Sequence, residues 1–102
     1  MKPTKMFVYG ILIGYKKDAI KAYLLNKEKY LNEGYFTIRH KKNSVVEGEI
    51  LDVSEEDLKV FDLIEGVQQD FYRRYITVAF DYSGNKIVVW AYKQVEGTNE
   101  NV

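Results

Sequence analysis

Short blocks of apolar and polar residues alternate along this chain, and their spacing predicts the first elements. Residues 6–9 are apolar or aromatic and stop at Gly10, which is typical of a short buried strand. From Asp18 to Leu31, apolar residues recur at near-helical spacing, and lysines fill many of the positions between them. This pattern predicts an amphipathic helix over residues 18–31.

The next blocks predict two strands. Gly34 ends the predicted helix, and the aromatic and β-branched residues of 35–38 form the first strand. Asn43 and Ser44 are turn-forming residues, so we expect a turn there. The second strand follows over residues 45–53, where apolar and acidic residues alternate.

A second helix is predicted after these strands, with signals at both of its ends. Ser54 can accept a hydrogen bond from the amide three residues on, and the acidic residues 55–57 suit the positive end of the helix dipole. Apolar residues then recur at helical spacing. Gly66 ends the helix just after Glu65.

The remaining blocks predict a hairpin. Residues 74–82 and 86–92 are rich in β-forming residues, and Ser83-Gly84-Asn85 joins them with turn chemistry. The predicted order is therefore β, α, β, β, α, β, β. It indicates an α+β fold in which a small, strongly curved sheet or mixed β-barrel carries peripheral helices.

Length and composition limit the possible classes of protein. A chain of 102 residues is expected to form one domain, here residues 1–95, with the polar residues 96–102 as a flexible C-terminal tail. The absence of cysteine excludes disulfides and thiolate chemistry. The apolar run near the N-terminus is too short to span a bilayer and lacks a signal-peptide cleavage site. We therefore expect a cytoplasmic protein without membrane contact.

The net charge is zero, but the two signs are distributed unevenly. Residues 1–42 hold ten Lys or Arg against three Asp or Glu, whereas residues 43–102 hold five against twelve. A basic segment of this kind can attract nucleic acid. The lysines are not accompanied by the aromatic and glycine pattern of an RNA-binding sheet, so solvated basic and acidic faces are the favoured interpretation.

Several common chemistries are disfavoured. The single histidine, His40, lies in a lysine-rich segment and has no second histidine with which to share a metal. A zinc site or a Ser-His-Asp triad is therefore not expected. Gly10 and Gly14 lack the spacing of a phosphate-binding loop. We expect no metal and no cofactor.

Two places remain where chemistry could occur. Gly10 follows a buried strand directly, where it either turns the chain or lets bare backbone amides face an anion. Glu65 lies among apolar residues at a helix end, where desolvation and the helix dipole should raise its pKa and suit it to proton transfer. A surface ion pair with Arg73 or Arg74 would explain Glu65 equally well. The residues alone leave both alternatives open.

Taken together, the motifs resemble those of the gamma-glutamylcyclotransferase-like superfamily. That family opens with a strand of the form Phe-Val-Tyr-Gly-Thr/Ser-Leu, and residues 7–12 here read FVYGIL. Its later Gly-Glu strand, Leu-Asp-x-x-Glu-Gly segment and Tyr-x-Arg motif are similar to GE at 48–49, FDLIEG at 61–66 and YRR at 72–74. The resemblance implies a small β-barrel with peripheral helices.

The resemblance also implies a reaction, in which the α-amine of a γ-glutamyl group attacks its own γ-carbonyl and releases 5-oxoproline and an amine. By this resemblance, Glu65 is the catalytic acid/base. The backbone amides of residues 10–12 (Gly10, Ile11 and Leu12) hold the glutamyl carboxylate or the developing oxyanion. Tyr9 and Tyr72 line the substrate pocket.

The chain departs from the family pattern in two places. Ile11 stands where the family has Thr or Ser, which removes a hydroxyl and leaves the backbone amide. Residues 14–43 do not resemble the family. These departures leave two hypotheses: an enzyme acting on a small γ-glutamyl amine or γ-glutamyl amino acid, or a non-catalytic binder of a small anionic ligand in the same pocket. The sequence makes no prediction of the oligomeric state.

Overall fold

A computed structural model describes residues 2–95, and the tail expected over residues 96–102 lies outside the described residues. The described part contains a closed five-stranded barrel, one α-helix and one short 3-10 helix. The elements in chain order are β1 (Lys5–Val8), β2 (Ile20–Asn32), β3 (Tyr35–Asp52), α1 (Glu55–Ile64), η1 (Val67–Gln69), β4 (Tyr72–Asp81) and β5 (Lys86–Gln94).

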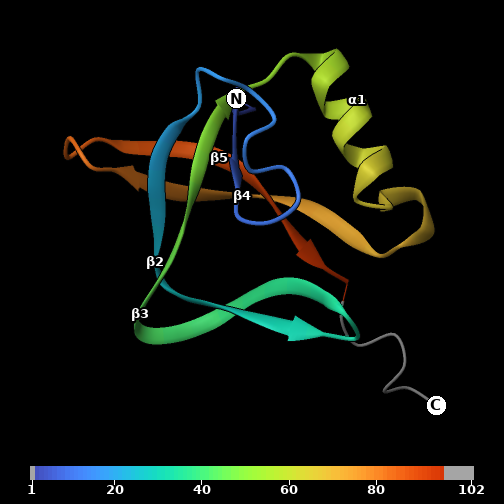
Figure 1. The fold of residues 1–102 in the computed structure, drawn as a ribbon, viewed down its shortest axis with the longest axis horizontal. Coiled ribbons are helices and arrows are strands. Elements are labelled where there is room, and N and C mark those ends of the chain that lie inside the picture. Colours follow the sequence, from blue (N-terminus) through green and yellow to red (C-terminus); the bar gives the residue numbers. More distant parts are fainter. Residues whose placement is uncertain (1, 96–102) are drawn as a thin grey trace.

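The strands follow one another around the barrel in the order β1-β3-β2-β4-β5 (Figure 1). Four of the pairings are antiparallel, and a parallel contact between Met6 of β1 and Trp90 of β5 closes the barrel. Closure removes the open edges that a small sheet would otherwise expose. The predicted mixed β-barrel is therefore confirmed.

Strand β1 is buried on both faces, as its unbroken apolar sequence predicts. Successive side chains of a strand point to opposite faces. Phe7 accordingly joins the cluster inside the barrel, whereas Met6 and Val8 join a second cluster that packs against Leu58 and Phe61 of α1. Helix α1 therefore covers the outside of β1.

Gly48 explains the Gly-Glu motif of β3. A Cβ atom at this position would lie 2.1 Å from the carbonyl oxygen of Val8 and 2.7 Å from the Phe7 ring. Only a residue without a side chain lets β3 approach β1 this closely.

The helix predicted over residues 18–31 is wrong, because this segment forms β2. Buried positions on β2 alternate as in a strand, with Ala22 and Leu24 inside the barrel. Ile20, Leu25 and Leu31, which suggested a helical stripe, are exposed. Pairing with β3 along nearly the whole strand satisfies the backbone and overrides the helical spacing of the side chains.

The turn predicted at Asn43 and Ser44 is also wrong, since β3 continues through both residues. Asn43 instead forms a bend, with a positive φ of 66°, opposite a bulge in β2 at Asn26, where φ is 57°. The Asn26 side-chain oxygen accepts a hydrogen bond from the Asn43 amide at 3.0 Å. Asn tolerates this left-handed backbone, so the ladder resumes beyond the bend.

Beyond this bend, β2 and β3 form a hairpin that we call the distal arm (residues 27–40). In Figure 1 the arm diverges from the rest of β2 and β3 and lies below the barrel. Strand β2 pairs with β4 only at Ala22 and Tyr23, so the arm has no strand neighbour on that side. The arm contributes a separate wall to the functional site.

Helix α1 begins as predicted. Ser54 accepts a hydrogen bond from the Asp57 amide at 3.1 Å, and the Asp57 carboxylate accepts one from the Ser54 amide at 2.9 Å. This reciprocal capping box satisfies two amides that the helix leaves free.

In the part of the chain that the structure describes, no helix is long and apolar enough to cross a membrane.

Candidate active site

A broad cleft of about 1400 Å³ lies between the end of β1, the end of α1, the start of β4 and the distal arm. Its volume exceeds the roughly 300–1000 Å³ that is common for small-ligand pockets. All six residues that the resemblance assigns to the site line this one cleft: Tyr9, Gly10, Ile11, Leu12, Glu65 and Tyr72. They come from three segments that are far apart in the sequence, and the barrel brings them together.

Glu65 occupies the C-terminal end of α1. Its amide donates to the Phe61 carbonyl at 2.9 Å, and Gly66 then takes a left-handed conformation, with φ of 68°, that turns the chain away. The glycine is required at this point, because other residues adopt this conformation at a cost. The helix end thus fixes the backbone from which the Glu65 side chain projects.

The Glu65 carboxyl is mostly buried, and within residues 2–95 no hydrogen bond or ion pair engages it. Burial raises the pKa of Glu65 from 4.5 to about 7. A carboxyl group with a pKa in this range can both accept and donate a proton near neutral pH. This is the behaviour that the sequence predicted for a catalytic carboxyl.

In the structure, Glu65 forms no ion pair with Arg73 or Arg74. Arg73 lies 3.8 Å from the exposed carboxylate of Asp70. Arg74 donates two hydrogen bonds to Asp62, at 2.9 and 3.1 Å, and its guanidinium stacks over Trp90. Both arginines therefore have other partners, and Glu65 is left facing the cleft.

Residues 10–12, in the loop after β1, line the cleft. Gly10 supplies its carbonyl oxygen to the Ile13 amide at 3.0 Å, and Leu12 supplies its own to the Tyr15 amide at 3.1 Å. Among the hydrogen bonds within residues 2–95, none is donated by the amides of residues 10–12. Backbone amides without a partner, in a cleft that an acidic group also lines, suit a ligand that carries a carboxylate or develops an oxyanion.

Tyr9 and Tyr92 form the floor of the cleft. The Tyr9 hydroxyl donates to the Tyr92 carbonyl at 2.6 Å, and the Tyr92 hydroxyl donates to the Asp62 carboxylate at 2.6 Å. Asp62 thereby holds both Tyr92 and Arg74 in place. Burial raises the pKa of both tyrosines, and the nearby Glu65 carboxylate contributes to a smaller extent.

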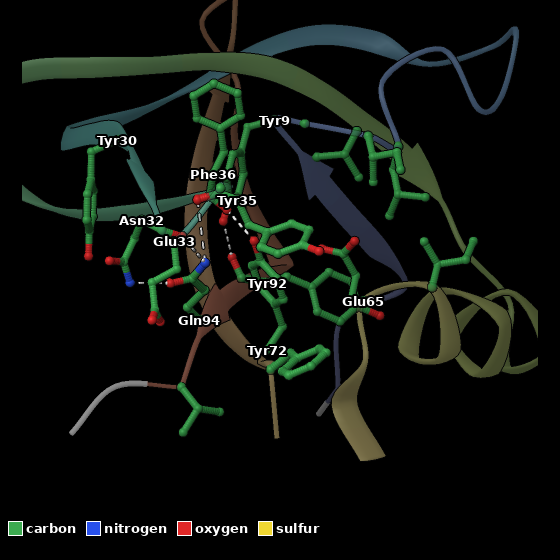
Figure 2. Close-up of a pocket in the computed structure, with 18 of the residues that line it drawn as sticks. Tyr9, Tyr30, Asn32, Glu33, Tyr35, Phe36, Glu65, Tyr72, Tyr92 and Gln94 are labelled. Carbon is green, nitrogen blue, oxygen red and sulfur yellow. Dashed lines mark hydrogen bonds between the residues drawn. The ribbon is translucent and has the colours of Figure 1, made fainter. Parts of the chain in front are cut away.

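Tyr72 links the floor to the distal arm. Its hydroxyl donates to the carbonyl oxygen of Phe36 at the tip of the arm (Figure 2). Burial raises the pKa of Tyr72, and the charge of Glu65 adds to this shift. The Tyr72 hydroxyl is therefore engaged with the protein, which identifies Tyr72 as a wall residue that also positions the arm.

Gln94 fastens the arm from the other side. Its side chain accepts a hydrogen bond from the Asn32 amide group at 2.7 Å and donates to the Asn32 carbonyl at 3.2 Å (Figure 2). Its backbone amide donates to the buried Thr37 hydroxyl at 3.0 Å. Glu65 stands at one end of the cleft and Tyr30, Asn32 and Glu33 stand at the other (Figure 2).

Sequence reasoning missed the residues of the arm and the supporting role of Asp62. A signal for Asp62 was present, because the Leu-Asp-x-x-Glu-Gly and Tyr-x-Arg motifs meet through the Asp62–Arg74 pair. The arm gave no such signal, since its segment was interpreted partly as a helix. Within the described residues, no cluster of His, Asp and Glu is arranged to hold a metal ion.

Several solved structures share this fold, among them the following three. One is a gamma-glutamyl cyclotransferase, with a TM-score of 0.73 and 17% identity, matched over 88% of this chain and 65% of that one. An uncharacterized protein from Homo sapiens gives 0.79 and 18% identity, over 94% and 69% of the two chains. A protein from Arabidopsis thaliana gives 0.72 and 26% identity, over 89% and 61%.

These similarities support the fold. The chain spans about two thirds of the length of these three proteins. No curated protein sequence matches it significantly. The family model for "Gamma-glutamyl cyclotransferase, AIG2-like" matches residues 6–101, which is nearly the whole chain. The chain therefore belongs to the gamma-glutamyl cyclotransferase, AIG2-like family.

Proposed function

We propose that this protein is a cyclotransferase that converts a small γ-glutamyl amine or γ-glutamyl amino acid to 5-oxoproline and the free amine. The observation that carries the proposal is the Glu65 carboxyl, mostly buried and without a partner among the described residues, with its pKa raised to about 7. It shares one cleft with the free amides of residues 10–12. A base and a set of amide donors are the two groups that this reaction needs.

In the proposed reaction, Glu65 removes a proton from the α-ammonium of the γ-glutamyl group. The freed amine attacks the γ-carbonyl carbon of the same molecule, which forms the ring C–N bond. The negative charge that develops on the carbonyl oxygen, or the charge of the α-carboxylate, is held by the amides of residues 10–12. Glu65 then returns the proton to the leaving nitrogen as the original amide bond breaks, and the extra proton on the new ring nitrogen passes to the released amine, which leaves as an ammonium ion.

The floor and walls of the cleft position the reacting group. Tyr9 and Tyr92 are fixed by hydrogen bonds to the protein, so they present rigid surfaces to the substrate. Ile11 supplies no hydroxyl, and its contribution to the reaction is its backbone amide. No cofactor takes part in these steps.

The test is incubation with a panel of γ-glutamyl amines and γ-glutamyl dipeptides, with 5-oxoproline measured by mass spectrometry. We expect release by the parent protein and a loss of about 100-fold or more in the Glu65→Gln variant, because general acid–base catalysis contributes on that scale. Circular dichroism of both proteins checks that the variant is folded. Equal turnover by the parent and the variant would contradict the role of Glu65.

A non-catalytic binder of a small anion is the alternative that the same experiment addresses. A carboxylate in the cleft would weaken anion binding, and this disfavours the alternative. Binding of a γ-glutamyl compound without release of 5-oxoproline, over the whole panel, would support it.

A further inference from the structure

Large apolar side chains are exposed around the mouth of the cleft. Ile11 is 79% exposed, Phe71 62% and Phe36 48%, and each lines the cleft from a different element. Tyr35 and Ile64 are exposed and line it as well. Exposed apolar side chains that line a cleft are available to contact the apolar part of a bound ligand.

The charged residues that line the cleft are all acidic. They are Glu33, Glu65 and Asp70, and within residues 2–95 no lysine or arginine lines it. Lys29 contacts two lining residues: its ammonium group donates to the Tyr9 carbonyl at 3.3 Å and lies 4.8 Å from the centroid of the Phe36 ring. Arg73 lies against Asp70 on the exposed rim. Among the described residues, those that line the cleft offer no cation to a second carboxylate, such as that of a released amino acid, and the nearby Lys29 ammonium is already engaged by Tyr9 and Phe36.

We propose, on the basis of the function above, that the cleft selects γ-glutamyl amides whose leaving amine carries an apolar group of aromatic size and no carboxylate. Ile11, Phe36 and Phe71 are the specificity-determining residues. The glutamyl group occupies the end of the cleft beside Glu65. The apolar part of the amine lies against the exposed side chains at the mouth.

The position of Phe36 supports this assignment. The Tyr72 hydroxyl binds the Phe36 carbonyl, and Gln94 holds the strand on the other side of the arm tip. The ring is thus presented from a wall that is already fixed, which reduces the entropy lost on binding. Phe71 is also fixed, because its side chain packs against the backbone of Gly66, directly after Glu65.

The apolar selection is tested with four matched ligands. They are the γ-glutamyl amides of phenethylamine, ethylamine, phenylalanine and 1,4-diaminobutane, which differ in the aromatic ring, the carboxylate and a terminal cation. Dissociation constants are measured by isothermal titration calorimetry on the Glu65→Gln variant, so that the ligands are not consumed. We expect the phenethylamide to bind about tenfold more tightly than the ethylamide and the diaminobutane amide, because contact with aromatic side chains supplies energy of this order. We also expect it to bind more tightly than the phenylalanine compound, which has the same ring but must bury a carboxylate without a cation among the lining residues.

The residue assignment is tested with Ile11→Thr, Phe36→Ala and Phe71→Ala in the same Glu65→Gln background. Each side chain is exposed, so the fold should tolerate its replacement. We expect each variant to lose most of the preference for the phenethylamide over the ethylamide. Ile13→Thr is the matched control for the loop, since Ile13 is exposed but does not line the cleft, and the preference should be unchanged.

The outcomes separate this inference from the proposed function. Equal binding of the phenethylamide and the ethylamide, or tightest binding of the phenylalanine or diaminobutane compound, would overturn the apolar selection. Retention of the preference in all three cleft variants would overturn the residue assignment. If the phenethylamide binds preferentially but the parent protein releases no 5-oxoproline, the apolar selection is supported and the proposed reaction is contradicted.

Discussion

At the scale of single residues, the site depends on a carboxyl group that the fold leaves without a partner. A partly buried carboxyl group that lines a cleft and has a raised pKa is a functional candidate. Glu65 has no hydrogen-bond partner among the described residues, and its carboxyl oxygens are not fully buried. Asp62, only three positions earlier, is bound by Tyr92 and Arg74. Two acids on one helix thus have separate tasks, one structural and one available to a ligand.

The raised pKa of Glu65 should make stability depend on pH. Between pH 4.5 and about 7 the folded protein holds a proton at Glu65 that the unfolded chain has lost. The free energy of unfolding therefore falls as the pH rises through this window. We expect Glu65→Gln to be more stable than the parent at pH 8 by up to about 3 kcal/mol and equal to it at pH 4.

Urea denaturation of both proteins at pH 4 and pH 8 measures this difference. Glu47→Gln is the control, because Glu47 is exposed on β3, and its replacement should change stability little at either pH. A Glu65→Gln variant that gains nothing at pH 8 would show that the carboxylate is not destabilising in the folded state.

Two glycines of the resemblance motifs should respond differently to a methyl group. At Gly48 a Cβ would meet the backbone oxygen of Val8 at 2.1 Å, whereas at Gly10 it would meet nothing within 4 Å. We expect Gly48→Ala to lower the free energy of unfolding by about 3 kcal/mol or more, and Gly10→Ala to change it by less than about 1 kcal/mol. Thermal denaturation checks both, and similar effects at the two positions would contradict the packing at Gly48.

At the scale of elements, the end of α1 and the distal arm were predictable to very different degrees. The residues that define the two ends of α1 are adjacent to it in the sequence: a capping box at Ser54 and a glycine after Glu65. The sequence therefore predicted both ends. The arm depends on pairing between β2 and β3 and on a bend shared by Asn26 and Asn43. Nothing local in residues 18–31 indicates that pairing, and their helical spacing was misleading.

The fixed position of the arm should depend on Gln94. Its side chain makes hydrogen bonds to both the side chain and the carbonyl of Asn32, so its removal frees the tip of the arm. We expect Gln94→Ala to speed amide hydrogen exchange at residues 30–38 and to raise the KM for the phenethylamide several-fold, about the effect of one or two lost hydrogen bonds.

Gln68→Ala is the control for this prediction, since Gln68 is exposed on η1 and does not line the cleft. Unchanged exchange at the arm tip in Gln94→Ala would show that Gln94 does not hold the arm. Faster exchange with an unchanged KM would show that the arm takes no part in binding.

At the scale of the whole molecule, the barrel joins the basic and acidic parts of the sequence. Lys16 of the basic part lies 2.7 Å from the Asp57 carboxylate, and Lys5 pairs with Asp52. The uneven charge of the sequence is thus partly balanced in the fold by ion pairs between the two parts. The residues that the motifs name line one cleft, because they lie at or near the ends of strands and helices that the barrel fixes.

The proton transfer assigned to Glu65 is the central claim, and the pH dependence of kcat/KM for 5-oxoproline release tests it most directly. The base must be ionised to act, so kcat/KM should rise with pH and level off through an apparent pKa of about 7. The residual activity of Glu65→Gln should lack this inflection. A profile that is flat between pH 5 and 9, or the same inflection in the variant, would contradict the account.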